Sequence, residues 1–97
     1  MSLEQVREEL KKIIEGLFYD EIEFSYDAMG FTMSFSHPAE LLGDMVGELD
    51  AMIEYNNPDT EELEMMLGGL KEMRYSFDLV VLRDAIEGLE EFLKELK

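Results

Sequence analysis

The fold prediction depends most on residues 22–35, which read IEFSYDAMGFTMSF. Apolar and polar side chains alternate on both sides of residues 27–30, and a period of two residues is typical of a strand with one buried face. The connection Asp27-Ala28-Met29-Gly30 suits a type I turn followed by a residue of positive φ. The stretch therefore predicts an antiparallel β-hairpin, whose apolar face consists of Ile22, Phe24, Tyr26, Phe31, Met33 and Phe35.

Apolar residues recur at helical spacing on both sides of this predicted hairpin. Ser2-Leu3-Glu4-Gln5 fits a capping box and begins a first helix, whose end falls near Gly16 to Tyr19. Pro38 suits the first position of a second helix, because the missing N–H is not needed there. Residues 55–58, Tyr-Asn-Asn-Pro, end that helix, since proline disfavours helical geometry in the residue before it.

Two further helices are predicted in the second half of the chain. Asp59 caps a third helix, in which Gly68-Gly69 predicts either a bend or an end, because each glycine costs about 1 kcal/mol relative to alanine. The last helix spans Asp78 to Leu96. Residues 77–81 fit either its first turn or an extended segment, since Val80 falls on the polar side of the helix.

These elements predict a single α+β domain over residues 1–97. A two-stranded antiparallel hairpin packs against about four helices in the order α-β-β-α-α-α, because an isolated hairpin is only marginally stable in water. The length is typical of one domain. A hydrophobic content of 46% is sufficient for one core and argues against disorder.

The composition offers little for catalysis. The chain has no Cys, which excludes a disulfide framework and a thiol nucleophile. Its one histidine, His37, stands beside Pro38 at a predicted helix start, which favours a junction residue over a catalytic base. No carboxylate falls on an apolar stripe, where burial would raise its pKa for acid–base chemistry. We therefore expect no enzyme activity, no catalytic residue and no cofactor.

One short segment is rich in oxygen ligands. It contains side chains of the kind that Ca²⁺ prefers, but their spacing differs from that of an EF-hand. A solvated turn followed by a helix cap is the favoured interpretation, and no metal site is predicted. The residues are Asn56, Asn57, Asp59, Glu61 and Glu62.

The charge is strongly negative and unevenly distributed. The chain has 24 acidic and 8 basic residues, a net charge of −16, and residues 13–70 contain 14 acidic residues but no Lys or Arg. Direct nucleic-acid binding depends on basic residues that neutralise phosphates, so it is not expected. A membrane surface with anionic headgroups is excluded on the same grounds. Basic protein surfaces are the expected partners.

The second predicted helix carries an arc of carboxylates opposite its apolar face. Like charges four residues apart destabilise a helix, and a basic partner would relieve that repulsion, although a merely solubilising face is the simpler alternative. Gly43 and Gly47 lie on the same arc, where small residues would allow a close approach. Met65 falls on the polar side of the third helix, and exposed methionines suit adaptable contacts. The predicted partner-binding residues are Glu40, Asp44, Glu48, Asp50, Glu54, Glu61 and Met65.

The sequence thus predicts a non-enzymatic regulator or inhibitor that docks an acidic face on a basic protein surface. In one version it mimics nucleic acid and occupies the phosphate-binding surface of a nucleic-acid-binding protein. One alternative is a scaffolding subunit that binds through apolar surface and the hairpin edge, and that edge would also allow a homodimer. Another is a protein that responds to divalent cations. With neither a signal peptide nor an apolar span, a cytoplasmic location is expected.

Overall fold

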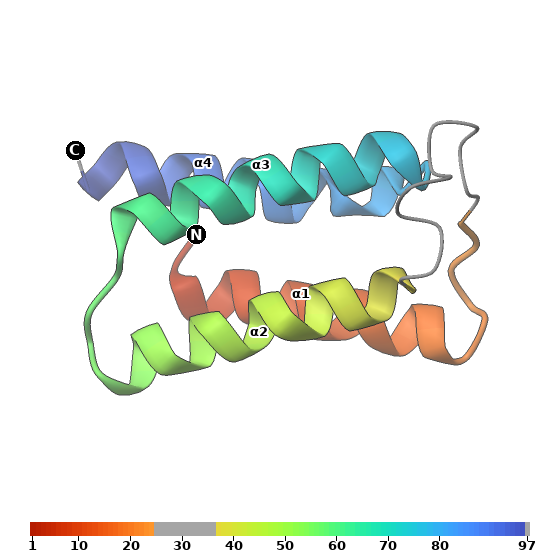
Figure 1. Ribbon diagram of the computed structural model, residues 1–97, viewed down its shortest axis with the longest axis horizontal. Helices are drawn as coiled ribbons and strands as arrows, with labels where there is room; N and C mark the ends of the chain where they lie inside the picture. The colour runs from red at the N-terminus through yellow and green to blue at the C-terminus, as the bar shows by residue number, and fades with distance from the viewer. Residues whose placement is uncertain (25–36, 97) are drawn as a thin grey trace.

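The computed structural model describes residues 1–24 and 37–96, which contain four α-helices and one short 3-10 helix. Successive α-helices run in opposite directions, so the described chain is an up-down-up-down helical bundle (Figure 1). The elements are α1 (Leu3–Phe18), α2 (Pro38–Glu54), α3 (Thr60–Ser76), η2 (Val80–Leu82) and α4 (Arg83–Leu96).

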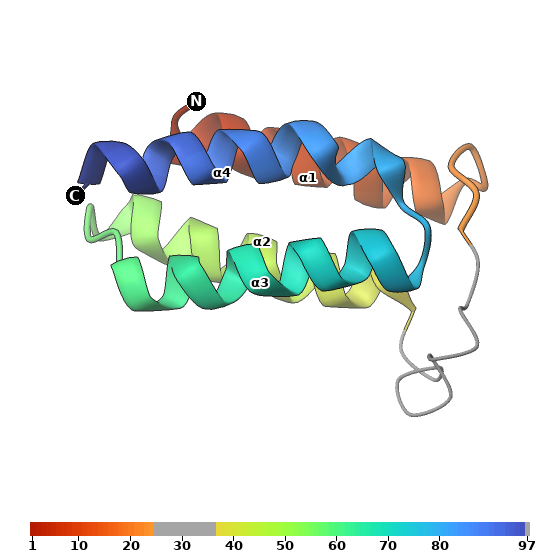
Figure 2. The same cartoon turned by 90° about the horizontal axis from the view of Figure 1, so that it is seen from above.

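The bundle has two layers, one of α1 and α2 and one of α3 and α4 (Figures 1 and 2). α1 packs closely against α2 and also against α4, and α3 packs against α4. α2 and α3 face each other on the remaining side and make far fewer contacts. Three sides of the bundle are therefore closed by helix packing, and the α2–α3 side is open.

The core is built from apolar residues of all four helices and of the segment between α3 and α4. Leu10, Leu49, Leu70 and Leu89, one from each helix, have no exposed surface. Burying such a side chain stabilises the fold by about 1.5–3 kcal/mol, so these amphipathic faces hold the bundle together. Within residues 1–24 and 37–96, no polar or charged side chain is buried. No helix in this part of the chain is both long and apolar enough to cross a membrane.

The helix starts follow the local sequence. Ser2 Oγ accepts a hydrogen bond from Gln5 N (3.2 Å) and Gln5 Oε1 accepts one from Ser2 N (2.8 Å), which confirms the capping box. Asp59 Oδ1 accepts from the backbone N–H of Glu62 at 3.2 Å, which confirms the cap of α3. At the start of α2, Pro38 takes the first position and His37 is the cap.

The first three helices end in the same way. The residue that follows each C-cap has a positive φ, of 58° at Asp20, 49° at Asn56 and 55° at Asp78. The next residue along the chain donates its N–H to the carbonyl five positions back, which is the Schellman arrangement. These hydrogen bonds run from Glu21 to Gly16 (2.8 Å), from Asn57 to Met52 (2.9 Å) and from Leu79 to Arg74 (3.0 Å).

The α+β prediction is wrong, because the described residues form helices and no strand, which makes the fold all-α. Only Ile22 to Phe24 of the predicted hairpin belong to the described chain, and residues 25–36 lie outside it. Ile22 folds back against the last turn of α1. Its N–H donates to the carbonyl of Gly16 at 3.0 Å, and its side chain packs over that glycine.

Phe24 also packs against the ends of helices. Its ring lies edge-on to that of His37, with centroids 4.9 Å apart, and to that of Phe77, with centroids 6.0 Å apart. The alternation of Ile22 and Phe24 therefore reflects packing against helix ends, which has no required period. A strand pattern in sequence cannot be distinguished from this arrangement without the positions of the helices.

The last helix also begins later than predicted. Asp78, the residue after the C-cap of α3, lies in the left-handed region, and Val80–Leu82 forms the 3-10 turn that precedes α4 at Arg83. Residues 77–81 are thus neither the first turn of the last helix nor a strand. α3 continues through Gly68-Gly69 to Ser76, because buried residues on both sides of the glycines hold it in place.

Candidate functional site: the groove between α2 and α3

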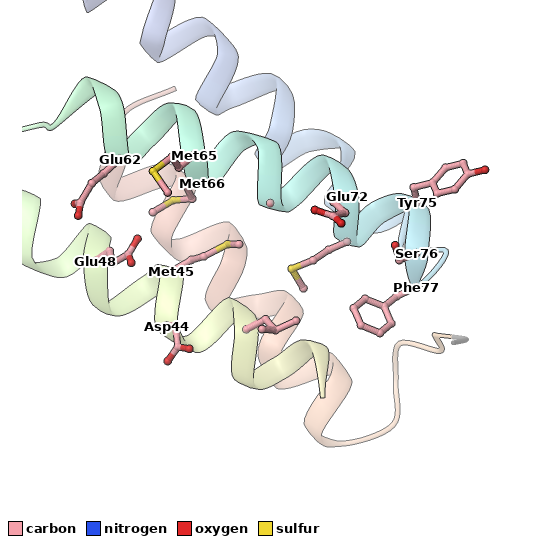
Figure 3. Close-up of a pocket in the computed structure, with 13 residues that line it drawn as sticks. Asp44, Met45, Glu48, Glu62, Met65, Met66, Glu72, Tyr75, Ser76 and Phe77 are labelled. Carbon is pink, nitrogen blue, oxygen red and sulfur yellow. The ribbon is translucent and has the colours of Figure 1, made fainter. Parts of the chain in front are cut away.

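The open side of the bundle forms a groove of about 690 Å³ between α2 and α3 (Figure 3). We call this feature the α2–α3 groove. Its α2 side consists of Leu41, Asp44, Met45 and Glu48. Its α3 side consists of Glu62, Met65, Met66, Gly69, Glu72, Met73, Tyr75, Ser76 and the adjoining Phe77.

The floor of the groove is apolar and rich in methionine. Met66, Met73 and Phe77 are buried members of the core and line the groove from α3 and its end. Met45 reaches towards them from α2 and is half-buried. A Cβ atom added at Gly69 would lie 3.0 Å from Cε of Met45, so the glycine makes room for the methionine methyl group.

Met65 lies at the edge of this floor and is 74% exposed. It comes from α3, next to the buried Met66 (Figure 3). An exposed methionine beside buried ones extends the apolar surface outwards from the core. Because the methionine side chain is unbranched and polarizable, such a surface adapts to different partner side chains.

Four carboxylates stand around this apolar floor. Asp44 and Glu48 come from α2, and Glu62 and Glu72 come from α3. All four side chains are exposed, and no Lys or Arg of residues 1–24 and 37–96 lines the groove. Among the described residues, no ion pair involves any of these four carboxylates. The rim is therefore uniformly anionic.

The environment of the groove shifts the pKa of Glu48. Partial burial raises the pKa of the Glu48 carboxyl above its ordinary value, and the negative charges of Glu62 and Asp44 raise it further. Glu62 belongs to the opposite helix, and it faces Glu48 across the opening (Figure 3). The groove thus concentrates negative charge at an apolar surface, where screening by water is weaker than on an open face.

The structure divides the predicted partner-binding residues into three groups. Asp44, Glu48 and Met65 come together in the groove. Asp50 lies towards α1, where its Oδ1 is 3.0 Å from Nη1 of Arg7. The remaining three, Glu40, Glu54 and Glu61, are exposed and lie outside the groove.

Sequence reasoning missed the other groove residues for identifiable reasons. In the sequence, Glu62 belongs to the oxygen-rich segment, for which a turn followed by a helix cap is the favoured interpretation, and Met45, Met66 and Met73 have the helical spacing of core residues. Glu72 is one of many carboxylates on polar helix faces. The available signal was the pair Met65-Met66, which widens the apolar stripe of α3 beyond what a closed helix interface needs.

The chemical groups of the groove are mainly carboxylates and thioethers. Among the described residues that line it, none carries an imidazole or a thiol, and the hydroxyl groups are those of Tyr75 and Ser76. Within residues 1–24 and 37–96, no group of three or more His, Cys, Asp or Glu is arranged to hold a metal ion. In the oxygen-rich segment, Asn56 ends α2 and Asp59 caps α3.

No protein family, curated protein or solved structure was found to match this chain.

Proposed function

We propose that this protein is a non-enzymatic interaction module that binds a basic protein surface in the α2–α3 groove and thereby regulates or inhibits its partner. One observation carries the proposal. Four carboxylates, Asp44, Glu48, Glu62 and Glu72, surround a methionine-rich floor that no basic residue of the groove neutralises. Lys or Arg side chains of a partner would pair with these carboxylates while apolar groups cover the floor.

The carboxylates of the unbound groove repel one another. Asp44 and Glu48 are one helical turn apart, and like charges at this spacing destabilise a helix by about 0.2–0.5 kcal/mol. Glu62 adds a further negative charge from α3, as the raised pKa of Glu48 indicates. A cationic partner converts this repulsion into attraction. The net charge of −16 also speeds the encounter with a basic partner by electrostatic steering.

The scaffolding alternative differs in what supplies the affinity. A scaffold would bind through apolar surface alone, so its affinity would change little with salt. The present proposal predicts an affinity that falls steeply as ionic strength rises, because exposed charges are screened over about 10 Å at 0.1 M salt. The hairpin edge predicted to serve the scaffold and the homodimer falls on residues outside the described chain.

Nucleic-acid mimicry is a narrower version that the geometry favours less. A mimic of nucleic acid depends on a bare row of carboxylates. Here Asp44 and Glu48 line the groove beside apolar side chains, whereas Oδ1 of Asp50 lies 3.0 Å from Nη1 of Arg7. We therefore propose a basic protein surface with apolar groups, in place of a bare phosphate-binding surface.

The test compares affinity capture by three versions of the protein. Glu48→Lys with Glu62→Lys reverses charge in the groove, and Glu15→Lys with Glu95→Lys makes the same change of net charge at exposed sites outside it. We expect basic proteins that bind the wild type and the control but not the groove variant, and that elute with salt. If both variants capture the same proteins as the wild type, the proposal is wrong.

A further inference from the structure

The α2–α3 groove has the shape of a site for one additional helix. α1–α2, α1–α4 and α3–α4 are packed pairs, whereas α2 and α3 are held apart with apolar side chains between them. Two neighbouring helices with an apolar furrow between them accept the apolar face of a third, as in other helix-in-groove complexes. We propose that the partner element is a cationic amphipathic α-helix, an inference that rests on the proposed function.

The length of the groove fits this occupant. Its lining extends along α3 from Glu62 to Phe77, a distance of about 22 Å at the helical rise of 1.5 Å per residue. A partner helix of about four turns would cover it. Such a helix places one apolar stripe towards its support, with anchors three or four residues apart.

The floor supplies contacts along this whole length. Met65 and Met66 lie near the Glu62 end, Met45 lies against Gly69 in the middle, and Met73 lies near the Phe77 end. Methionine accommodates branched and aromatic side chains equally, because its three rotatable bonds let it refill an irregular gap. The site therefore selects an apolar stripe and not one particular side chain.

The charge of the rim determines which polar residues the partner helix needs beside its apolar stripe. Asp44 and Glu48 stand on the α2 side of the floor, and Glu62 and Glu72 stand on the α3 side. A helix in the groove would have carboxylates on both flanks of its apolar stripe. Lys and Arg on both flanks complement this pattern, whereas acidic residues at those positions would be repelled from both sides.

The same charges disfavour a second copy of this chain as the occupant. Two copies meeting at their grooves would bring both sets of rim carboxylates together with no cation in either groove. Each copy also carries a net charge of −16. Opposite charge therefore favours a partner of different composition.

The experiment uses two synthetic peptides of about 16 residues, matched to the groove length. One is an amphipathic helix with Leu at i, i+3, i+4 and i+7 positions and Lys on both flanks. The other has the same composition in an order that spreads Leu around the helix. Affinity is measured by fluorescence anisotropy in low salt, and helix formation by circular dichroism of the mixture.

Three variants of the protein locate the binding. Met65→Gln removes apolar surface from the groove, and Val80→Gln is its control, because Val80 is 60% exposed and lies on η2 outside the groove. Glu48→Lys with Glu62→Lys reverses the charge of the rim. Methyl NMR of methionine adds a direct map, with groove methyls at Met45 and Met65 and a buried control outside the groove at Met52.

We expect the amphipathic peptide to bind at least about tenfold more tightly than its permutation and to gain helix on binding. Met65→Gln should weaken that binding about threefold or more and the charge reversal about tenfold or more, whereas Val80→Gln should leave it unchanged. The methyl resonances of Met45 and Met65 should shift, and that of Met52 should not.

The contrary outcomes separate the two proposals. If both peptides bind equally, and only the charge reversal weakens them, the partner is not an amphipathic helix but the acidic groove still binds basic chains. If the charge reversal changes neither affinity, both proposals are wrong. If sedimentation shows a wild-type dimer that Met65→Gln dissociates, a second copy fills the groove and the helix inference is overturned.

Discussion

Met45 of α2 and Gly69 of α3 meet across the open side of the bundle. A Cβ atom at position 69 would lie 3.0 Å from Cε of Met45, which is tighter than an ordinary carbon–carbon contact. The adjacent Gly68 is different, because an added Cβ there would meet nothing within 4 Å. Two neighbouring glycines of one helix therefore have different reasons to be glycine.

Alanine at these two positions should separate the reasons. Gly68→Ala should raise the free energy of unfolding by about 1 kcal/mol, because alanine has the higher helix propensity. Gly69→Ala should raise the free energy of unfolding clearly less, because the methyl group of Met45 must move to make room. Urea denaturation of the two variants measures the difference. Equal gains would contradict the contact between Met45 and Gly69.

Gly43 and Gly47 test where the partner sits. Both lie on the exposed arc of α2 with open space beside them, and neither lines the groove. Each change to alanine should raise the free energy of unfolding by about 1 kcal/mol. Binding of the amphipathic peptide should be unchanged in the double variant. A loss of binding would place the interface on the exposed arc and not in the groove.

Substitutions of Asp78 test the positive φ that follows the C-cap of the first three helices. Its φ of 55° lies in the left-handed region, which costs a residue with a side chain about 1 kcal/mol relative to glycine. Asp78→Gly should therefore raise the free energy of unfolding by about 0.5–1 kcal/mol, and Asp78→Ala should lower it. Thermal denaturation compares the two. Equal melting temperatures for glycine and alanine would exclude a strained residue at this position.

Glu48 makes stability depend on pH. Its pKa is raised in the folded protein, so the folded state binds the proton more tightly than the unfolded state and this carboxyl costs stability as pH rises through the folded pKa. At neutral pH, Glu48→Gln should raise the free energy of unfolding by about 0.2–0.5 kcal/mol, because the partial burial of a charge and its repulsion by Glu62 and Asp44 are removed.

The advantage of Glu48→Gln should shrink as pH falls, since the wild-type carboxyl is then protonated as well. Denaturation of both proteins across the acidic range measures this convergence. Glu15→Gln is the control, because Glu15 is exposed on α1 away from the groove. An advantage that persists unchanged in acid would contradict a raised pKa at Glu48.

The parts of the fold that the sequence predicted correctly are local ones. Ser2, Pro38 and Asp59 begin helices through bonds and conformations that involve only the next few residues, so the sequence pattern alone identifies them. Ile22 and Phe24 could not be interpreted in this way. Phe24 packs on Phe77, whose position depends on how distant helices are arranged, and Ile22 covers Gly16 only because the chain turns back at the end of α1. The alternation of the two residues fits a strand equally well.

The same distinction between local features and contacts among distant segments applies to the candidate site. The helical period is sufficient to predict that Asp44, Glu48 and Met65 are exposed. It cannot show that Glu62 faces Glu48, because the sequence does not reveal that α2 and α3 lie side by side with few contacts between them. Predicting the groove required both a correct topology and the degree of contact between two particular helices.

The unequal packing of the four helices has a consequence for motion. Within the described chain, α1 and α4 form the main link between the α1–α2 pair and the α3–α4 pair. A rotation about that link would change the separation of α2 and α3 while leaving the α1–α2 pair and the α3–α4 pair intact. Backbone amides along α1 and α4 should then exchange with deuterium last, and the width of the opposite side would adjust to the diameter of whatever enters it.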